Sequence, residues 1–222
     1  MEPCNIFPSP IWKGHFTGDL TKLEQRSLNF LKDPKTNISA LMEGGISSGP
    51  DLEPPHEWEE AKEFMNWTAD FCNKVWIDWN YLNMPWEQIE QTSWVNLFPQ
   101  NGYAGEHSHC RDCLVIVLYI KKAVGAIGGN LEINNPLFYH WEGSPRADGH
   151  YWEEIEVEAG DVVIIPGWML HRTTPNKSSE DRVTMSVNLN VISTLPSHLT
   201  RRFDAAVEYL NQEETNNRIT FR

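Results

Sequence analysis

The sequence predicts a mainly β fold, a sandwich or closed barrel with helices flanking it. Beyond Pro85, short apolar runs alternate with turn residues, which is typical of antiparallel β proteins. Before Pro85, apolar residues recur every three or four positions, as on one face of a helix. The chain has 222 residues, 40% of them hydrophobic, and β barrels of this length often form one domain. We therefore expect a single domain over residues 1–222.

Helical support is expected mainly at residues 19–83. Asp19 is placed to cap a helix that extends to about residue 31. A longer helical pattern covers residues 58–82, and its aromatic residues are interpreted as core packing against a sheet. Residues 44–55 are rich in Gly, Ser and Pro and predict a loop.

The barrel core is expected mainly at residues 93–191. A first strand is expected near the N-terminus and a last helix at residues 201–212. Lys121 and Lys122, beyond Tyr119, are interpreted as a solvated strand end. The expected strands are residues 11–16, 94–98, 114–120, 130–133, 155–157, 162–166 and 184–191.

Charge and composition argue against several classes of protein. The net charge of −13 disfavours nucleic acid and anionic membranes as main partners. No apolar stretch has the length of a membrane span, and no secretory signal is visible. The four cysteines are too few and too scattered for a disulfide scaffold. We expect a cytoplasmic protein, and the oligomeric state stays open, with a homodimer as one option.

Three histidines are candidate metal ligands. His107 and His109 are two residues apart, so in a strand they point to the same side and can converge on one metal. By itself this pair also fits a surface turn. His171 follows the buried strand at residues 162–166 and a Pro-Gly turn, and it is the candidate third ligand.

Arg182 is a candidate anion-binding residue. It lies eleven residues after His171, and the residues that follow it alternate like a strand entering the core. A buried guanidinium needs a carboxylate partner, and its geometry suits a bidentate one. A surface salt bridge with Glu180 or Asp181 is the alternative.

Together these motifs make the chain recognisable. It resembles the 2-oxoglutarate/Fe(II) oxygenases of the prolyl 4-hydroxylase-like superfamily, and within it the bacterial and phage group with an H-x-H motif. The likeness extends in order over most of the chain. It comprises Phe7-Pro8-Ser9-Pro10-Ile11, Ser93-Trp94-Val95-Asn96, His107-Ser108-His109, Val117-Leu118-Tyr119-Ile120, Gly129-Asn130-Leu131-Glu132-Ile133, Gly160-Asp161 through Pro166, His171, Pro175, Arg182 and Ser186-Val187-Asn188.

The resemblance implies a fold, cofactors and roles. The fold is a double-stranded β-helix, a jelly-roll or cupin-like barrel buttressed by helices. His107 and His171 correspond to the iron ligands, and Arg182 to the residue that binds the distal carboxylate of 2-oxoglutarate. Tyr119 and Thr184 are placed to help hold that carboxylate. The activity implied is a dioxygenase, a hydroxylase that uses Fe(II), 2-oxoglutarate and O2 on a small-molecule or protein substrate that the sequence does not identify.

The second metal ligand departs from the superfamily pattern. The common motif is H-x-D or H-x-E, whereas His109 stands at the carboxylate position. Three neutral ligands leave the metal more positively charged, although a three-histidine site still holds Fe(II) in thiol dioxygenases, which use no 2-oxoglutarate. Asp112 is the second choice for this position. Glu106 is expected on the opposite side of the strand.

Other interpretations remain open at this point. Cys110 and Cys113 form a C-x-x-C that we interpret as coincidence rather than half of a zinc site. The aromatic-rich loop at residues 134–152 fits a lid or an ordinary surface loop equally well. Two alternatives to the oxygenase are a cupin-like accessory protein that binds a metal or ligand without catalysis, and a three-histidine iron dioxygenase independent of 2-oxoglutarate.

Overall fold

The structure is a computed structural model that describes residues 11–33, 35–36, 42–78, 89–109, 114–135 and 151–191. Contacts divide the chain into residues 1–191 and residues 192–222. The helix expected at residues 201–212 lies outside the described residues, and the single domain of residues 1–222 stays a prediction.

A six-stranded antiparallel sheet, which we call the large sheet, dominates the fold. Its strand order is β1-β9-β6-β11-β4-β3. β11 is central, and it pairs with β4 over its whole length and with β6 over most of it. The strands are β1 (Trp12–His15), β3 (Ile46–Ser47), β4 (Ile89–Phe98), β6 (Leu114–Lys121), β9 (Asp161–Pro166) and β11 (Arg182–Val191).

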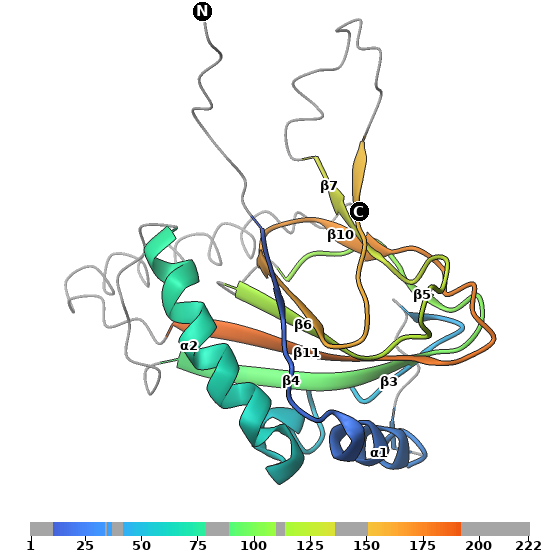
Figure 1. The fold of residues 1–222 in the computed structure, drawn as a ribbon, viewed down its shortest axis with the longest axis horizontal. Coiled ribbons are helices and arrows are strands. Elements are labelled where there is room, and N and C mark those ends of the chain that lie inside the picture. Colours follow the sequence, from blue (N-terminus) through green and yellow to red (C-terminus); the bar gives the residue numbers. More distant parts are fainter. Residues whose placement is uncertain are drawn as a thin grey trace, which may run out of the picture. The chain divides into compact units, whose positions relative to one another are not determined.

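Two smaller antiparallel sheets complete the β structure. One has the order β10-β7-β8 and the other pairs β2 with β5. Figure 1 shows β7, β10 and β5 together on one side of the large sheet. The strands are β2 (Met42–Glu43), β5 (Tyr103–Ala104), β7 (Leu131–Asn134), β8 (Trp152–Ile155) and β10 (His171–Thr173).

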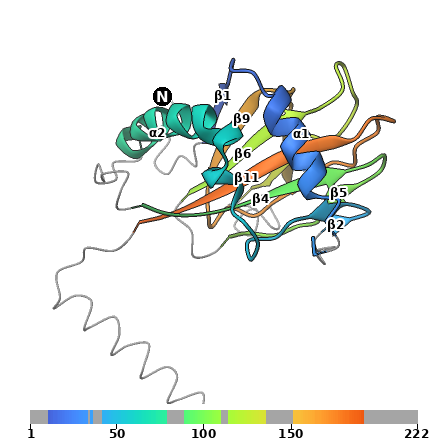
Figure 2. The same ribbon diagram turned by 90° about the horizontal axis from the view of Figure 1, so that it is seen from below.

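Helices cover the other face of the large sheet (Figures 1 and 2). They are α1 (Thr21–Phe30) and α2 (Lys62–Asp78), the latter preceded by two short 3₁₀ turns at Pro55–Glu57 and Glu59–Ala61. The carboxylate of Asp19 accepts the amide of Thr21 at 2.9 Å, but the N-cap residue of α1 is Leu20, so the predicted cap at Asp19 was wrong by one residue. Within the described residues, no helix is both long and apolar enough to cross a membrane.

Several predicted elements were wrong in their bounds. The long helix begins at Lys62 rather than at residue 58, because Trp58 has an extended backbone between the two 3₁₀ turns. The predicted loop at residues 44–55 contains β3, which is too short to show an alternating pattern. β8 ends at Ile155, because the amide of Val157 turns to the side chain of Asn130.

The alternation of side chains along β11 explains the two faces of the large sheet. Its odd-numbered residues from 183 to 189 are buried against the helices, together with one face of β6. Its even-numbered residues from 182 to 188, which are Arg182, Thr184, Ser186 and Asn188, are polar and also buried. Since successive strand residues point to opposite faces, the polar row lies on the face away from the helices, where the smaller sheets lie.

Candidate metal centre

His107 and His171 lie directly opposite each other in an isolated antiparallel bridge. The amide of each donates to the carbonyl of the other at 2.9 Å, and their ring centroids are 4.3 Å apart. In each ring Nδ1 donates to the carbonyl two residues earlier, that of Gly105 at 2.7 Å and that of Met169 at 2.9 Å. Because a carbonyl only accepts, both rings carry the proton on Nδ1, and Nε2 is free to bind a metal.

His109 completes the group from the same segment. Its amide donates to the carbonyl of Gly167 at 2.8 Å, so the segment follows the turn before His171. Its ring lies nearly parallel to that of Trp94, with 5.7 Å between centroids. It is 5.2 Å from the rings of both His107 and His171.

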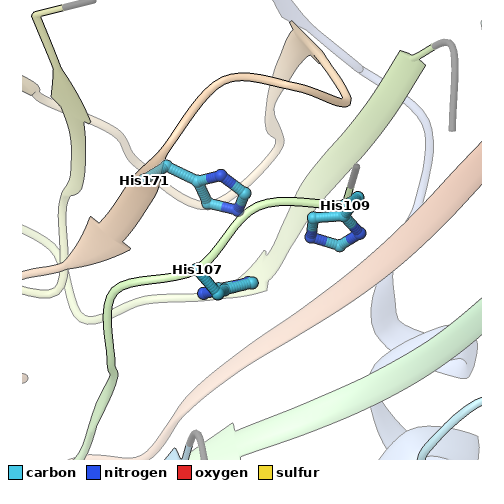
Figure 3. Close-up of side chains that lie close together, drawn as sticks. All are labelled: His107, His109 and His171. Atoms are coloured by element: carbon cyan, nitrogen blue, oxygen red, sulfur yellow. The ribbon is translucent and has the colours of Figure 1, made fainter. Parts of the chain in front are cut away.

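The three histidines form a metal-binding geometry, seen in Figure 3. One ring nitrogen of each lies within 4.8 Å of the others. Three imidazole nitrogens at ~2.1 Å from one metal would lie roughly 3.0–3.4 Å apart, so a small movement of the rings suffices. The donor set suits Fe, Zn, Ni or Cu. Their role as ligands stays a prediction.

Burial keeps these imidazoles neutral, which is the form that binds metal. Burial lowers the pKa of His171 to about 3, and the neighbouring His107 lowers it further in the same direction. The pKa of His109 is lowered to about 4, again mainly by burial and then by His107. Burial also lowers the pKa of His107 below its ordinary value.

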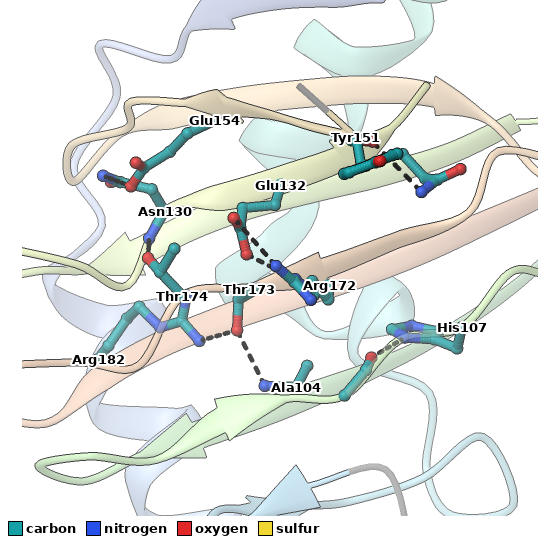
Figure 4. A network of polar contacts seen from close by, with 12 residues as sticks. Ala104, His107, Asn130, Glu132, Tyr151, Glu154, Arg172, Thr173, Thr174 and Arg182 are labelled. Carbon is teal, nitrogen blue, oxygen red and sulfur yellow. Dashed lines mark hydrogen bonds and ion pairs between the residues drawn. The ribbon is translucent and has the colours of Figure 1, made fainter. Parts of the chain in front are cut away.

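Arg182 is a buried cation on the first residue of β11, and its side chain is only 1% exposed. Nη1 donates to the carbonyl of Gly129 at 2.6 Å and Nη2 to the hydroxyl of Thr173 at 3.1 Å, as Figure 4 shows in part. Its Cζ lies 4.1 Å from the ring centroid of Phe98. Burial lowers its pKa to about 10, so it is charged at neutral pH.

No carboxylate neutralises Arg182 among the described residues. Its Nε is buried without a hydrogen-bond partner there. The surface salt bridge with Glu180 or Asp181 was therefore the wrong alternative. A buried guanidinium without an anion is costly, so the surroundings of Arg182 suit an anionic ligand.

Tyr119 and Thr184 lie opposite each other across β6 and β11. The Tyr119 hydroxyl is buried and has no hydrogen-bond partner among the described residues. Burial raises its pKa to about 12, so it keeps its proton and can donate. The hydroxyl of Thr184 accepts from the Asn96 amide at 3.3 Å.

One cavity contains both groups of residues. The three histidines, Arg182, Tyr119 and Thr184 all line it. The apolar side chains of Val115, Val117 and Leu131 also line it. The remaining lining residues are Met42, Trp94, Asn96, Phe98, Ala104, Thr173 and Ser186.

Other sequence-based expectations need correction or fall outside the described residues. His107 and His109 are not in a regular strand, because only His107 forms a bridge. Lys122 is not solvated but 9% exposed and hydrogen-bonded. Asp112, Cys110 and Cys113, and residues 136–150 of the predicted lid, lie outside the described residues. Glu106 is exposed, but the strand on whose opposite side it was expected is absent at this position.

Thr173 and Gly129, which hold Arg182, were missed by the sequence reasoning as functional residues. β10 is only three residues long and gives no periodic signal. The one available signal was the Gly128-Gly129 pair, whose positive φ angles of 75° and 66° suit glycine.

The chain is similar to known proteins in part of its sequence and in its fold. Residues 92–188 match the family model described as "Putative 2OG-Fe(II) oxygenase". This segment contains the three histidines, Arg182, Tyr119 and Thr184. No curated protein matches the chain.

Solved structures show the fold. A Pseudomonas putida prolyl-4-hydroxylase is 14% identical, with a TM-score of 0.57 over 82% of this chain and 92% of that one. A Trichoplax adhaerens prolyl hydroxylase, solved with a hypoxia inducible factor oxygen degradation domain peptide, is 12% identical, with a TM-score of 0.54 over 82% and 83%. HygX from Streptomyces hygroscopicus, solved with nickel and 2-oxoglutarate, is 11% identical, with a TM-score of 0.53 over 82% and 83%. The predicted double-stranded β-helix is therefore confirmed.

Proposed function

Because residues 92–188 match the 2OG-Fe(II) oxygenase family, we propose that the protein is a 2-oxoglutarate- and Fe(II)-dependent oxygenase that hydroxylates its substrate. The observation that carries the proposal is Arg182, a buried cation without a carboxylate partner among the described residues, in the same cavity as three neutral histidines. A cavity with a metal-binding end and an anion-binding end fits a ligand that is both a chelator and a carboxylate.

His107, His109 and His171 are proposed to hold Fe(II). Two of them are oriented by backbone carbonyls that fix the proton on Nδ1, and His109 is supported by the Trp94 ring. With 2-oxoglutarate, bound Fe(II) supplies the O2-activating chemistry that yields succinate and CO2. Because all three ligands are neutral, the site keeps the full charge of the ion.

Arg182 is proposed to bind the distal carboxylate of 2-oxoglutarate. A guanidinium has five N–H groups, and two of them donate to Gly129 and Thr173. The three that remain, including the unpartnered Nε, are available to a carboxylate. The hydroxyls of Tyr119 and Thr184 line the same cavity and add donors. The apolar walls exclude water, which strengthens these contacts.

The substrate is proposed to be a small molecule or a protein side chain, with O2 as co-substrate. A peptide accompanies the Trichoplax relative, and this supports a protein substrate only by analogy of fold. Cytoplasmic location and the absence of nucleic-acid and membrane partners stay predictions from the sequence.

The three-histidine set favours one alternative, an iron dioxygenase independent of 2-oxoglutarate. That activity leaves the buried charge of Arg182 unexplained, and so does a cupin-like binding module. Succinate release separates these functions. Protein supplied with Fe(II), ascorbate and 2-oxoglutarate should release succinate above a chelator-treated control, even without substrate. No succinate from metal-loaded protein, with or without candidate substrates, would contradict the proposal.

A further inference from the structure

Lys122 is a buried lysine just beyond β6, and it lines a second cavity that is distinct from the one that Arg182 lines. Its ammonium donates to Oδ1 of Asn130 at 2.5 Å and to the carbonyl of Val157 at 2.6 Å. Lys121, one residue earlier, instead forms an ion pair with Glu24 at 3.3 Å. Burying an ammonium group costs free energy even when it is hydrogen-bonded. The burial of Lys122 therefore calls for a functional explanation.

Asn130 links this lysine to the surrounding strands, and Figure 4 shows its contacts with Glu154 and Thr174. Its Oδ1 accepts from Lys122 and from the amide of Val157 at 3.3 Å, while Nδ2 donates to Glu154 at 2.8 Å. Its backbone amide donates to the hydroxyl of Thr174 at 2.9 Å. The side chain of Asn130 is therefore held by Lys122, Glu154 and Val157, whereas its backbone is held by Thr174.

The peptide unit between Gly129 and Asn130 connects this network to Arg182. Its N–H belongs to Asn130 and is fixed by Thr174, whereas its carbonyl belongs to Gly129 and accepts from Nη1 of Arg182 at 2.6 Å. Because a peptide unit is planar, fixing Asn130 also fixes the direction of the Gly129 carbonyl. A Cβ added at Gly129 would lie 3.2 Å from Cδ of Arg182, so the backbone packs closely against this side chain.

Charge adds to this geometric link. Burial lowers the pKa of Lys122, and Arg182 lowers it further, while Glu154, Glu156 and Glu158 raise it. The carboxylates that compensate Lys122 therefore lie on β8 and just beyond it, on the side of Asn130. Arg182, by contrast, lines the cavity of the three histidines and has no compensating carboxylate among the described residues.

We propose that Lys122 and Asn130 are positioning residues for the 2-oxoglutarate site, which aim Arg182 through the Gly129 carbonyl and touch no ligand themselves. The inference rests on the proposed function. It predicts that changing either residue weakens the binding only of ligands that carry the distal carboxylate. If Lys122 and Asn130 only stabilised the β6–β7 connection, their substitution would instead lower the affinity for every ligand of the site to the same extent.

Lys122→Met removes the ammonium and keeps most of the side-chain volume. Lys121→Met is the matched control, and Asn130→Ala is a second variant in case Lys122→Met does not fold. Binding to Mn(II)-loaded protein is measured for 2-oxoglutarate and for pyruvate, a 2-oxo acid without the distal carboxylate. Calorimetry gives the first Kd, and water-proton relaxation by Mn(II) gives the second.

The proposal predicts that Lys122→Met and Asn130→Ala raise the Kd for 2-oxoglutarate about tenfold or more relative to Lys121→Met. Their Kd values for pyruvate and for Mn(II) should stay within about twofold of the control. Equal loss of both oxo acids, or no loss of 2-oxoglutarate binding, would overturn the inference alone. A wild-type protein that binds neither oxo acid would overturn the proposed function and the inference with it.

Discussion

The backbones of His107 and His171 form a reciprocal hydrogen-bonded pair, in which each amide donates to the other's carbonyl at 2.9 Å. This pair brings a segment after β5 against the start of β10 and sets the distance between two imidazoles. Both rings are oriented by carbonyls of their own segments. The metal-binding geometry is therefore built into the backbone before any metal binds.

His109 should be a metal ligand in spite of the usual carboxylate at its position. Mutating a residue that only hydrogen-bonds to a metal ligand typically lowers metal affinity about 10- to 100-fold. His109→Ala removes a ligand itself, so it should weaken Fe(II) or Mn(II) binding by at least this much. Competition with a coloured chelator measures this affinity. Affinity equal to that of the wild type would show that another group, such as Asp112, takes this position.

Tyr119→Phe should separate ligand binding from stability. The hydroxyl has no hydrogen-bond partner within the described residues, so removing it should leave the Tm unchanged or raise it slightly. The Kd for 2-oxoglutarate should rise about two- to tenfold, the equivalent of one hydrogen bond of about 0.5–1.5 kcal/mol. Thermal melting of the ligand-free protein and calorimetry test the two effects. A lower Tm with unchanged affinity would make Tyr119 a structural residue.

Acid should destabilise the metal-free protein through the three histidines. The pKa of His171 is lowered to about 3 and that of His109 to about 4 in the folded protein, whereas unfolded histidines titrate near 6.5. The unfolded chain therefore binds more protons as the pH falls below about 6.5, and stability decreases from there toward pH 4. Tm should fall between pH 7 and pH 5.

His171→Leu supplies the control for this pH dependence, because it removes the histidine whose pKa is lowered the most. The fall in Tm with pH should be smaller in this variant than in the wild type. Parallel curves for the two proteins would show that other groups cause the acid sensitivity.

Much of the fold follows from local pattern, and the failures have physical causes. The alternation after Arg182 correctly predicts a strand that buries this residue, because one polar and one apolar face leave a single register. Lys122 was misplaced because it continues a strand end that looks solvated, and only the tertiary contact with Asn130 buries it. β10 was missed because three residues carry no period.

The site shows the same division. The spacing of His107 and His109 indicates a pair, but the backbone bridge to His171 depends on segments more than 60 residues apart. The anion site could be suspected from Arg182 alone. Arg182 is held by Gly129, which lies just before β7, and by Thr173, which lies in β10. No local sequence pattern links these two residues.

The measurement that tests the central claim most directly is calorimetry of 2-oxoglutarate binding to the Mn(II)-loaded protein and to its Arg182→Ala variant. Removing one partner of a buried ion pair costs roughly 3–5 kcal/mol, so the Kd should rise by about two to three orders of magnitude or more. Mn(II) affinity should hardly change, and Arg26→Ala, a surface arginine paired with Glu53, should bind 2-oxoglutarate as the wild type does. Equal affinity in wild type and Arg182→Ala, or no binding in either, would contradict the account.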